Sequence, residues 1–344
     1  MSASPGNAPV AGDPTTPLLK AVEVKKHFRV GNSILPGQHR TVYAVDGVSL
    51  EVWPGETLGL VGESGCGKST LGRCLMRLYE ITDGRILLNG ADISHLGPRR
   101  LRPFRRQMQM VFQDPYASLN PRRRVGDLIA EPLRVHARLE KAAIERRLKE
   151  LMGLVGLHPD HLNRFPHEFS GGQRQRIGVA RALALEPRLI VADEPVSALD
   201  VSIQAQIVNL LADLQERLGL TYIFIAHDLS VVRQVSSRIA VMYLGAIAET
   251  GSTEVVYGAP AHPYTEALIS AVPVPELDRV SKRERIVLAG DVPSPMNPPA
   301  GCRFHPRCRY ATDRCRAERP VLRPLPDGRQ VACHYPLAGE AGHQ

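Results

Sequence analysis

Residues 62–70 form a glycine-rich segment, GESGCGKST, that could hold a phosphate group. The segment matches the pattern G-x-x-x-x-G-K-[S/T] at each fixed position. Glycines let backbone N–H groups approach a phosphate closely, and a helix that follows adds the partial positive charge of its N-terminus. We expect Lys68 to reach the β- and γ-phosphates of a nucleotide and the Ser69 hydroxyl to bind Mg²⁺. The candidate nucleotide contacts are Gly62, Glu63, Ser64, Gly65, Cys66, Gly67, Lys68, Ser69 and Thr70.

The segments on either side of this loop have the patterns that a phosphate-binding loop requires. Residues 57–61 are a short apolar run, which predicts a buried strand. Residues 71–79 place Leu71, Leu75 and Leu78 on one helical face. A glycine-rich turn that matches the pattern by chance is the alternative, and the strand and helix on either side argue against it.

Polar side chains follow three further apolar runs along the chain. Asp193 and Glu194 follow residues 189–192, where one carboxylate could hold Mg²⁺ and the next could polarise an attacking water. Gln113 and His227 each end another predicted strand. Each of these residues taken singly has a structural alternative, such as a surface histidine or a helix-cap glutamate. Their order along the chain favours one catalytic site.

A second candidate anion-binding helix N-terminus lies at residues 170–176, SGGQRQR. This segment opens an amphipathic helix predicted over residues 177–185, and its serine and glycines could approach a phosphate. The segment 197–200 follows the two carboxylates and ends in Asp200. The additional candidate nucleotide contacts are therefore Ser170, Gly171, Gly172, Gln173 and Asp200.

The elements that must position these residues have an α/β order. Residues 18–30, 42–52 and 85–88 predict a small antiparallel sheet beside a parallel core. Residues 108–113, 188–193 and 221–226 predict further core strands, and residues 203–218 predict a crossover helix between the last two. We expect a disordered tail over residues 1–17, a nucleotide-binding domain over residues 18–250 with a helical insertion at about 114–169, and a second region over residues 251–344.

Composition places few limits on function. The chain has 344 residues, 43% of them hydrophobic, and a formal net charge of +8. No run approaches the roughly 18 apolar residues of a membrane-spanning helix, and the N-terminus has no secretory pattern, so we expect a cytosolic protein. The arginine surplus is compatible with nucleic acid, an anionic ligand or a membrane surface.

These motifs together resemble the ATP-binding subunit of an ABC transporter over residues 18–251. The resemblance implies a P-loop NTPase (RecA-like) core with a flanking antiparallel sheet, a helical insertion subdomain and a Cys-rich C-terminal extension. Residues 62–70 resemble the Walker A loop, 170–173 the signature motif and 197–200 the D-loop. Gln113 resembles the Q-loop glutamine, Asp193 the Walker B aspartate and His227 the switch histidine.

The resemblance also implies a mechanism with ATP and Mg²⁺ as cofactors. Ser69, Gln113 and Asp193 would surround Mg²⁺, Glu194 would be the general base, and His227 would contact the γ-phosphate. Phe28 or Tyr43 would stack on adenine, and Phe28 is preferred. Two such domains would meet head to tail, each ATP lying between one Walker A loop and the partner's signature motif. The helical insertion would receive a short permease helix at the cytoplasmic face of the membrane.

Several segments resemble the peptide-importer branch of this family. They include the HPY-T motif at residues 262–265, the segment 290–295 and the segment 301–308. The segment 116–121 resembles the second, "F"-type ATPase of such importers. The resemblance implies a second ATP-binding subunit, two transmembrane permease subunits and an extracytoplasmic peptide-binding protein as partners. A nickel or other small-solute importer is the nearest alternative. An ATPase acting on nucleic acid is less favoured because the chain has one cassette and no coiled-coil insertion, so we expect no nucleic-acid partner.

Four cysteines, Cys302, Cys308, Cys315 and Cys333, lie in the C-terminal region with the spacing C-x5-C-x6-C-x17-C. This spacing differs from the C-x-x-C pairs of zinc ribbons. Four thiolates on a proline-rich loop suit a [4Fe–4S] cluster, and the family resemblance points the same way. A zinc site that draws on His305 or His334, and free thiols, are the alternatives. A cluster here would act as a structural staple because the region is poor in apolar residues.

Overall fold

The computed structural model describes residues 16–31, 40–137, 139–272 and 285–337. The core is an eight-stranded sheet in the order β11-β12-β10-β9-β3-β8-β7-β6. Its parallel part comprises β3 (Thr57–Val61), β6 (Met108–Val111), β7 (Leu189–Asp193), β8 (Thr221–Ile225) and β9 (Arg238–Tyr243). Every residue of β3, β7 and β8 is buried, as expected of parallel strands covered on both faces. The predicted parallel core is confirmed.

The strand order explains why distant polar residues meet. Parallel neighbours β3, β8, β7 and β6 all end at the same edge of the sheet. Helix α1 (Lys68–Leu75) follows the loop after β3, and α8 (Leu229–Val235) follows β8. Helix α7 (Val201–Leu218) is the predicted crossover between β7 and β8. The segments that follow these strands therefore share one side of the molecule, where ligands bind in open α/β sheets.

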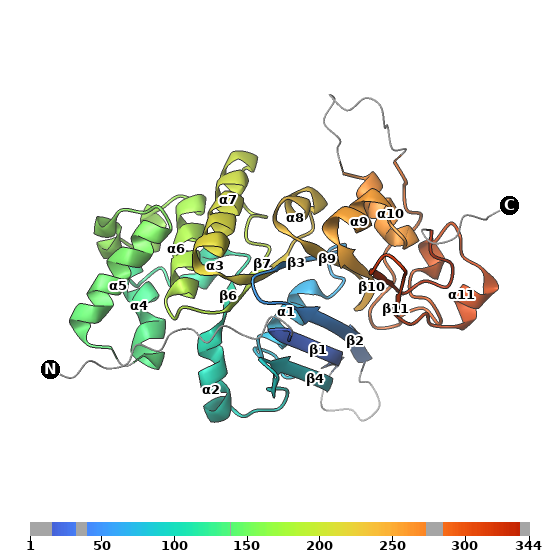
Figure 1. Cartoon of the computed structure of the whole chain (residues 1–344), viewed down its shortest axis with the longest axis horizontal. Helices are drawn as coiled ribbons and strands as arrows, with labels where there is room; N and C mark the ends of the chain where they lie inside the picture. Colours follow the sequence, from blue (N-terminus) through green and yellow to red (C-terminus); the bar gives the residue numbers. More distant parts are fainter. Residues whose placement is uncertain (1–15, 32–39, 138, 273–284, 338–344) are drawn as a thin grey trace.

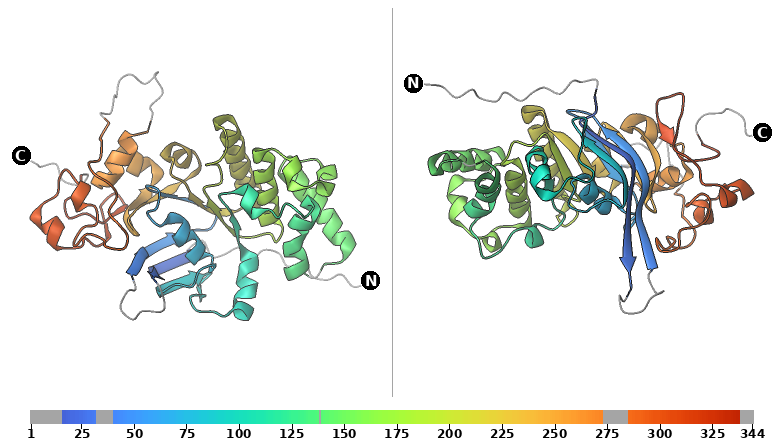
Figure 2. Two further views of the ribbon diagram at one scale, coloured as in Figure 1. Left: turned by 180° about the vertical axis from the view of Figure 1, so that it is seen from behind. Right: turned by 90° about the horizontal axis from the view of Figure 1, so that it is seen from below.

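A four-stranded antiparallel sheet packs beside α1 in the order β2-β1-β4-β5 (Figure 1). Its strands are β1 (Leu19–Val30), β2 (Arg40–Val52), β4 (Asp83–Leu88) and β5 (Ala91–Asp92), which confirms the predicted small sheet. Leu19, Val45 and Ile86 from this sheet share a hydrophobic core with Leu71 of α1 and Leu58 of β3. Figure 2 shows β1 and β2 projecting from the body as a long ribbon.

A helical unit occupies the insertion, on the opposite side of the sheet from the C-terminal region (Figure 1). It comprises α3 (Pro115–Ser118), α4 (Val125–His136), α5 (Lys141–Leu154), the 3-10 turns at Pro159–Asn163 and Pro166–Glu168, and α6 (Gly171–Leu183). Leu128, Leu151 and Ile177 join its helices in a hydrophobic core that continues to β7 through Ile190. Helix α2 (Pro98–Gln107) precedes β6.

The C-terminal segment extends the central sheet. Strand β10 (Ala246–Ser252) pairs antiparallel with both β9 and β12 (Gln330–Val331), and β12 pairs with β11 (Arg323–Pro324). The remaining elements are α9 (Thr253–Gly258), α10 (Pro263–Ser270), the 3-10 turn His305–Arg307 and α11 (Asp313–Ala317). Tyr264 and Phe304 from this segment are buried against Tyr243 of β9. The C-terminal segment is thus packed onto the central sheet.

Two helix boundaries differ from the predictions. Helix α1 begins at Lys68 and ends at Leu75, so Leu78 lies beyond it and is 46% exposed. Helix α6 begins at Gly171, six residues before its predicted start at residue 177, because Ser170 caps it. The apolar periodicity used for prediction is absent from the polar first turn of α6. The predicted tail falls almost wholly outside the described residues. Among the described residues, no helix is long and apolar enough to cross a membrane.

Candidate functional site

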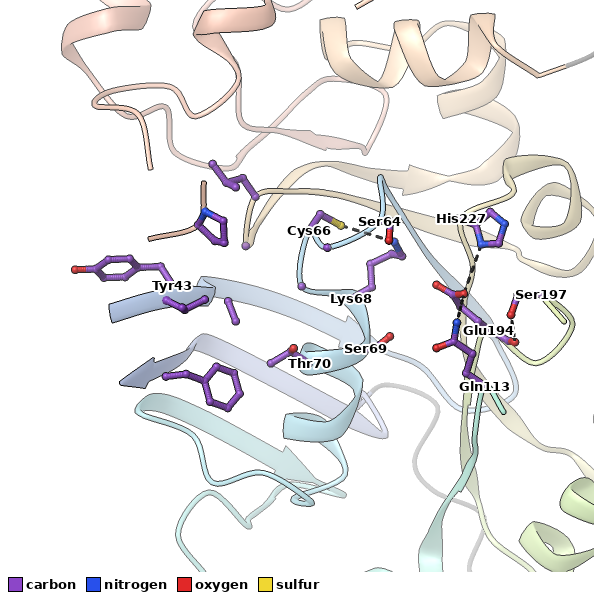
Figure 3. Close-up of a pocket in the computed structure, with 18 of the residues that line it drawn as sticks. Tyr43, Ser64, Cys66, Lys68, Ser69, Thr70, Gln113, Glu194, Ser197 and His227 are labelled. Atoms are coloured by element: carbon purple, nitrogen blue, oxygen red, sulfur yellow. Dashed lines mark hydrogen bonds and ion pairs between the residues drawn. The ribbon is translucent and has the colours of Figure 1, made fainter. Parts of the chain in front are cut away.

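A pocket of about 820 Å³ opens where the carboxyl ends of the parallel strands face the antiparallel sheet (Figure 3). It brings together most of the predicted site residues. The predicted residues that line it are Phe28, Tyr43, Ser64, Gly65, Cys66, Gly67, Lys68, Ser69, Thr70, Gln113, Glu194 and His227.

The loop before α1 has a backbone that requires glycine at two positions. Gly62 and Gly67 have φ values of 153° and 105°, which residues with a side chain rarely adopt. A Cβ atom at Gly62 would lie 2.1 Å from the Met242 carbonyl oxygen, and one at Gly67 would lie 2.1 Å from the Ala44 carbonyl oxygen. The loop is therefore held closely against β9 and β2, with its backbone shaped around the pocket.

Lys68 lies along the inside of this loop. It is buried, and its ammonium donates hydrogen bonds to the carbonyl oxygens of Gly62, at 2.7 Å, and Glu63, at 2.9 Å. A lysine ammonium has three donors, so these contacts orient the group while leaving capacity for a phosphate oxygen. Figure 3 shows the side chain running back along the loop beside Cys66 and Ser64.

Ser69 and Asp193 form an oxygen pair beneath the pocket. The Ser69 hydroxyl donates to Asp193 Oδ1 at 2.6 Å. Asp193 is fully buried, and within the described part of the chain its Oδ2 accepts no hydrogen bond, although the Arg73 guanidinium lies 3.8 Å away. Burial raises the pKa of the Asp193 carboxyl, against the opposing effects of Ser69 and Arg73. A hydroxyl oxygen beside a buried carboxylate oxygen that can still accept an interaction suits Mg²⁺, which prefers oxygen ligands.

Side chains that follow three different strands meet at the Glu194 carboxylate. Gln113, beyond β6, donates its amide to Glu194 Oε2 at 2.8 Å, and His227, beyond β8, places Nδ1 3.5 Å from the same oxygen. Both side chains point toward Glu194 in Figure 3. Glu194 itself has the left-handed φ of 46°, and its N–H donates to the Ile225 carbonyl at 2.9 Å. Such strained backbone is typical of functional positions.

The signature segment does not face this pocket. Ser170 is exposed and caps α6, its hydroxyl accepting from the Gln173 N–H while the Gln173 side chain accepts from the Ser170 N–H. Gly172 packs against α7, where a Cβ would lie 2.6 Å from Ile203 Cγ2. Asp200, at the start of α7, is also exposed. Neither this segment nor Asp200 lines the pocket. Within one chain, these predicted nucleotide contacts lie on the outer surface.

Both candidate aromatic residues line the pocket from the antiparallel sheet. Phe28 on β1 meets Tyr79 edge to face, with ring centroids 5.8 Å apart, and the Lys26 ammonium lies 4.8 Å from its centroid. Tyr43 on β2 meets His27 edge to face at 4.7 Å. Either ring could offer a face to a nucleotide base.

Several pocket residues were missed by the sequence analysis, namely Val42, Ala44, Leu244, Gly245 and Pro295. Leu244 and Gly245 form the tight turn between β9 and β10, with φ values of 42° and 81°, and the Gly245 N–H donates to the Cys66 carbonyl at 2.8 Å. Pro295 comes from the C-terminal segment, and its carbonyl accepts from the Tyr43 N–H at 2.9 Å. The glycine between two strands signalled the turn. No local pattern in the sequence places Pro295 beside a phosphate-binding loop.

The four C-terminal cysteines line one small cavity of about 20 Å³ together with His305 and His334. All four are free thiols. Burial raises the pKa of Cys302, Cys308 and Cys333, to about 11 for Cys333. In the part of the chain that the structure describes, no three His, Cys, Asp or Glu residues are grouped closely enough to hold a metal ion. The expected [4Fe–4S] or zinc centre is thus not preformed in this arrangement of side chains.

Comparison with known proteins divides the chain into two matched regions. A family model described as "ABC transporter" matches residues 45–197. A second, described as "Oligopeptide/dipeptide transporter, C-terminal region", matches residues 248–315. The first match contains the loop of residues 62–70, Gln113, Asp193 and Glu194, and the second begins within β10.

Several curated proteins resemble the chain over nearly its whole length. The oligopeptide transport ATP-binding protein AppF of Bacillus subtilis is 53% identical, covering 92% of this chain and 97% of that protein. The oligopeptide transport ATP-binding protein OppF of Escherichia coli is 52% identical, covering 89% and 92%. The di/tripeptide transport ATP-binding protein DppF of Pseudomonas aeruginosa is 50% identical, covering 92% and 97%.

Solved structures resemble the nucleotide-binding part. A dimeric post-hydrolysis state of the ATP-binding cassette MJ0796, bound to ADP and Pi, has a TM-score of 0.61 and 29% identity. The match covers 68% of this chain and 98% of that one. The protein cbiO1 of Clostridium perfringens, described as part of the ABC transporter complex cbiONQ, has a TM-score of 0.60 and 27% identity, covering 71% of this chain and 91% of that one.

Proposed function

Because this chain belongs to the ABC transporter ATP-binding proteins, in their oligopeptide and dipeptide branch, we propose that it powers peptide import by binding and hydrolysing ATP. The observation that carries the proposal is the meeting of Lys68, the Ser69–Asp193 pair and Glu194 at one pocket. Relatives named for oligopeptide and di/tripeptide transport support the choice of cargo.

Each residue of the pocket has a distinct role in this proposal. The Walker A loop at residues 62–70 and Lys68 bind the phosphates. Ser69 and Asp193 hold Mg²⁺, which neutralises charge on the β- and γ-phosphates when it is bound. Glu194 accepts a proton from the attacking water, while Gln113 and His227 orient the Glu194 carboxylate through their contacts with Oε2.

We infer that the complete ATP site needs a second cassette. The exposed N-terminus of α6, with Ser170 at its cap, faces away from the chain's own pocket and so remains free to reach a nucleotide held by another subunit. A helix N-terminus favours negative charge, so ATP would bridge the two subunits. A solved relative, the cassette MJ0796, is described as a dimer. The partner is proposed to be a homologous but different chain.

The membrane partners are proposed to bind at a groove of about 630 Å³ between the core and the helical unit. Gln113 and Asp114 line it together with Met76, Phe112 and Pro132. Gln113 borders both this groove and the nucleotide pocket, so it can transmit a change in nucleotide state from the pocket to the groove. The groove suits a short helix from one of the two permease subunits, with the protein at the cytoplasmic face of the membrane. A peptide-binding protein would deliver cargo from the other side.

The residue ranges 18–250 and 251–344 are proposed as the nucleotide-binding domain and its importer-specific extension. We also propose that the four extension cysteines hold a [4Fe–4S] cluster, because all four thiols face one cavity. Cluster binding would require these side chains to close in and lose their protons. Iron and acid-labile sulfide should co-purify with the protein under anaerobic conditions and be absent from Cys315→Ser. Zinc in place of iron, or no metal, would refute the cluster.

Glu194→Gln tests the proposed chemistry. The variant keeps the side-chain size and a hydrogen-bonding group for Gln113 but cannot accept a proton. In the assembled transporter we expect ATP binding to persist and hydrolysis to fall by about 100-fold or more. Glu254→Gln, an exposed change on α9, serves as the matched control. Hydrolysis at the wild-type rate in Glu194→Gln would show that another group is the base.

A further inference from the structure

The C-terminal extension contacts the phosphate-binding loop at Glu63. The Arg307 guanidinium donates two parallel hydrogen bonds to the Glu63 carboxylate, at 2.7 and 3.1 Å. The Tyr264 hydroxyl accepts a hydrogen bond from the Glu63 N–H at 2.8 Å. These two residues are separated from Glu63 by 244 and 201 positions along the chain. The extension therefore holds both the side chain and the backbone of one residue in the loop.

Glu63 is also the residue that orients Lys68. Its carbonyl oxygen accepts from the Lys68 ammonium at 2.9 Å, beside the similar contact to Gly62. A continuous set of hydrogen bonds thus runs from Arg307 and Tyr264 through Glu63 to the lysine that faces the phosphates. Displacement of Glu63 would move the carbonyl that positions the Lys68 ammonium.

The contacts from the extension are well shielded from water. The Arg307 side chain is 7% exposed and that of Glu63 26%. Tyr264 is fully buried between Tyr243 and Phe304, with ring centroids at 4.7 and 5.4 Å. Bidentate Arg–carboxylate pairs have fixed geometry, and their electrostatic attraction is stronger where water is excluded. The position of Glu63 is accordingly set by the extension as well as by its own loop.

We propose that Arg307 and Tyr264 are positioning residues for ATP binding, which hold Glu63 so that its carbonyl orients Lys68 toward the phosphates. This inference rests on the proposed nucleotide pocket. The extension would thus contribute to the ATPase reaction by positioning Lys68. Two further contacts reach the walls of the same pocket: Arg303 donates to the Leu244 carbonyl, and the Pro295 carbonyl accepts from Tyr43.

The test compares Arg307→Gln with Arg309→Gln in the full chain. Arg309 lies two residues away, and one of its guanidinium nitrogens donates at the surface to both Glu266 carboxylate oxygens, so it is a matched control for loss of an arginine. Binding of Mg²⁺-ATP is measured by titration calorimetry, and the thermal midpoint is recorded for each variant. We expect Arg307→Gln to raise the Kd for ATP about tenfold, and Arg309→Gln to leave it unchanged.

A double-mutant cycle distinguishes positioning through Glu63 from a general loss of packing. Glu63→Gln and Arg307→Gln should each weaken ATP binding, and the double variant should bind no more weakly than either single one. Arg307→Lys keeps the positive charge but loses the planar guanidinium that donates two parallel hydrogen bonds. Its affinity for ATP should therefore lie between those of Arg307→Gln and wild type. Tyr264→Phe, which removes only the hydroxyl, should also raise the Kd while keeping its aromatic packing.

Two results would overturn the inference. If Arg307→Gln and Tyr264→Phe fold and bind ATP within twofold of wild type, the extension does not position the loop. If the effects of Glu63→Gln and Arg307→Gln add fully, Arg307 does not act through Glu63. A wild-type chain that binds no ATP at all would instead refute the proposed nucleotide pocket and the inference with it.

Discussion

Asp193 shows how a single buried residue can favour function over stability. Its side chain is fully shielded from solvent; the Ser69 hydroxyl donates to one of its oxygens, and the other has no hydrogen-bond partner among the residues that the structure describes. Removing a carboxylate from water disfavours its charged form, which is why its pKa is raised. A bound divalent cation would reverse this balance because it favours the deprotonated group.

Asp193→Asn should therefore raise the thermal midpoint of the metal-free protein at neutral pH while abolishing hydrolysis. The folded-state pKa lies above the unfolded value of about 3.9, so the carboxylate destabilises the fold fully only above the raised pKa. The advantage of the variant should shrink as the pH falls through the raised folded-state pKa and vanish below the unfolded pKa, where both states carry the proton. Thermal unfolding of both proteins across this pH range measures the difference.

Asp213→Asn is the control for this pH series, because Asp213 is exposed on α7 and pairs with Arg217 at the surface. Its thermal midpoint should match that of wild type at every pH, since ion pairs at the surface contribute little to stability. A metal-free Asp193→Asn protein that is less stable than wild type at neutral pH would contradict the argument from burial.

At the scale of elements, the ribbon of β1 and β2 supplies the aromatic wall of the pocket. The two strands pair so that Phe28 lies opposite Val42 and His27 opposite Tyr43. Adjacent residues on one strand point to opposite faces, so this register determines which side chains share a face of the ribbon. Because paired residues share a face, Phe28 and Tyr43 lie on opposite faces of the two-stranded ribbon, although both line the pocket.

We expect Phe28→Ala to weaken ATP binding more than Tyr43→Ala. Base–aromatic stacking contributes about 1–3 kcal/mol, so loss of the stacking ring should raise the Kd for ATP by about tenfold or more. Affinity for inorganic triphosphate, which has no base to stack, should be the same in both variants and in wild type. A larger loss with Tyr43→Ala would assign the stacking role to Tyr43 instead.

At the scale of the whole molecule, the two anion-binding helix ends lie apart. The N-terminus of α1 faces the pocket, whereas that of α6 is exposed on the helical unit and does not line it. Val201, beside Asp200 at the start of α7, is 82% exposed. An exposed apolar side chain next to an exposed helix N-terminus agrees with a surface that a second subunit covers.

Ser170→Arg should leave ATP binding to the isolated chain nearly unchanged but abolish ATP-dependent association with the partner subunit. The bulky cation would occupy the place proposed for the partner's γ-phosphate. Sedimentation with Mg²⁺-ATP, in a Glu194→Gln background and with the corresponding substitution in the partner subunit, measures the association.

Ser252→Arg is the matched control, because Ser252 caps α9 in the same manner and lies in the C-terminal segment. Both variants lose an N-cap, at a stability cost of about 1 kcal/mol, but only Ser170→Arg alters the proposed interface. Association that survives Ser170→Arg would show that α6 does not complete the partner's site.

Much of the fold was predictable from sequence because its strands and helices have strong local patterns. The strand over residues 57–61 was predicted to the residue, and the crossover helix predicted over residues 203–218 begins two residues earlier, at Val201. The start of α6 was missed because its first turn is polar and contains two glycines, so neither hydrophobic periodicity nor helix propensity marks it. Its capping serine was the only local signal.

The sequence by itself determined which chemical groups the site contains and the local backbone that carries them. Glycine at positions 62 and 67, lysine at 68 and carboxylates at 193 and 194 all act through local geometry, which short stretches of sequence encode.

Only the tertiary structure decided which of these groups meet. It places Glu194 between Gln113 and His227 because β6, β7 and β8 are parallel neighbours, while it leaves Ser170 on the outer surface. It also brings Tyr264 and Arg307 onto Glu63. Contacts between residues this far apart depend on how layers pack and in which order strands pair, and no short sequence pattern encodes that.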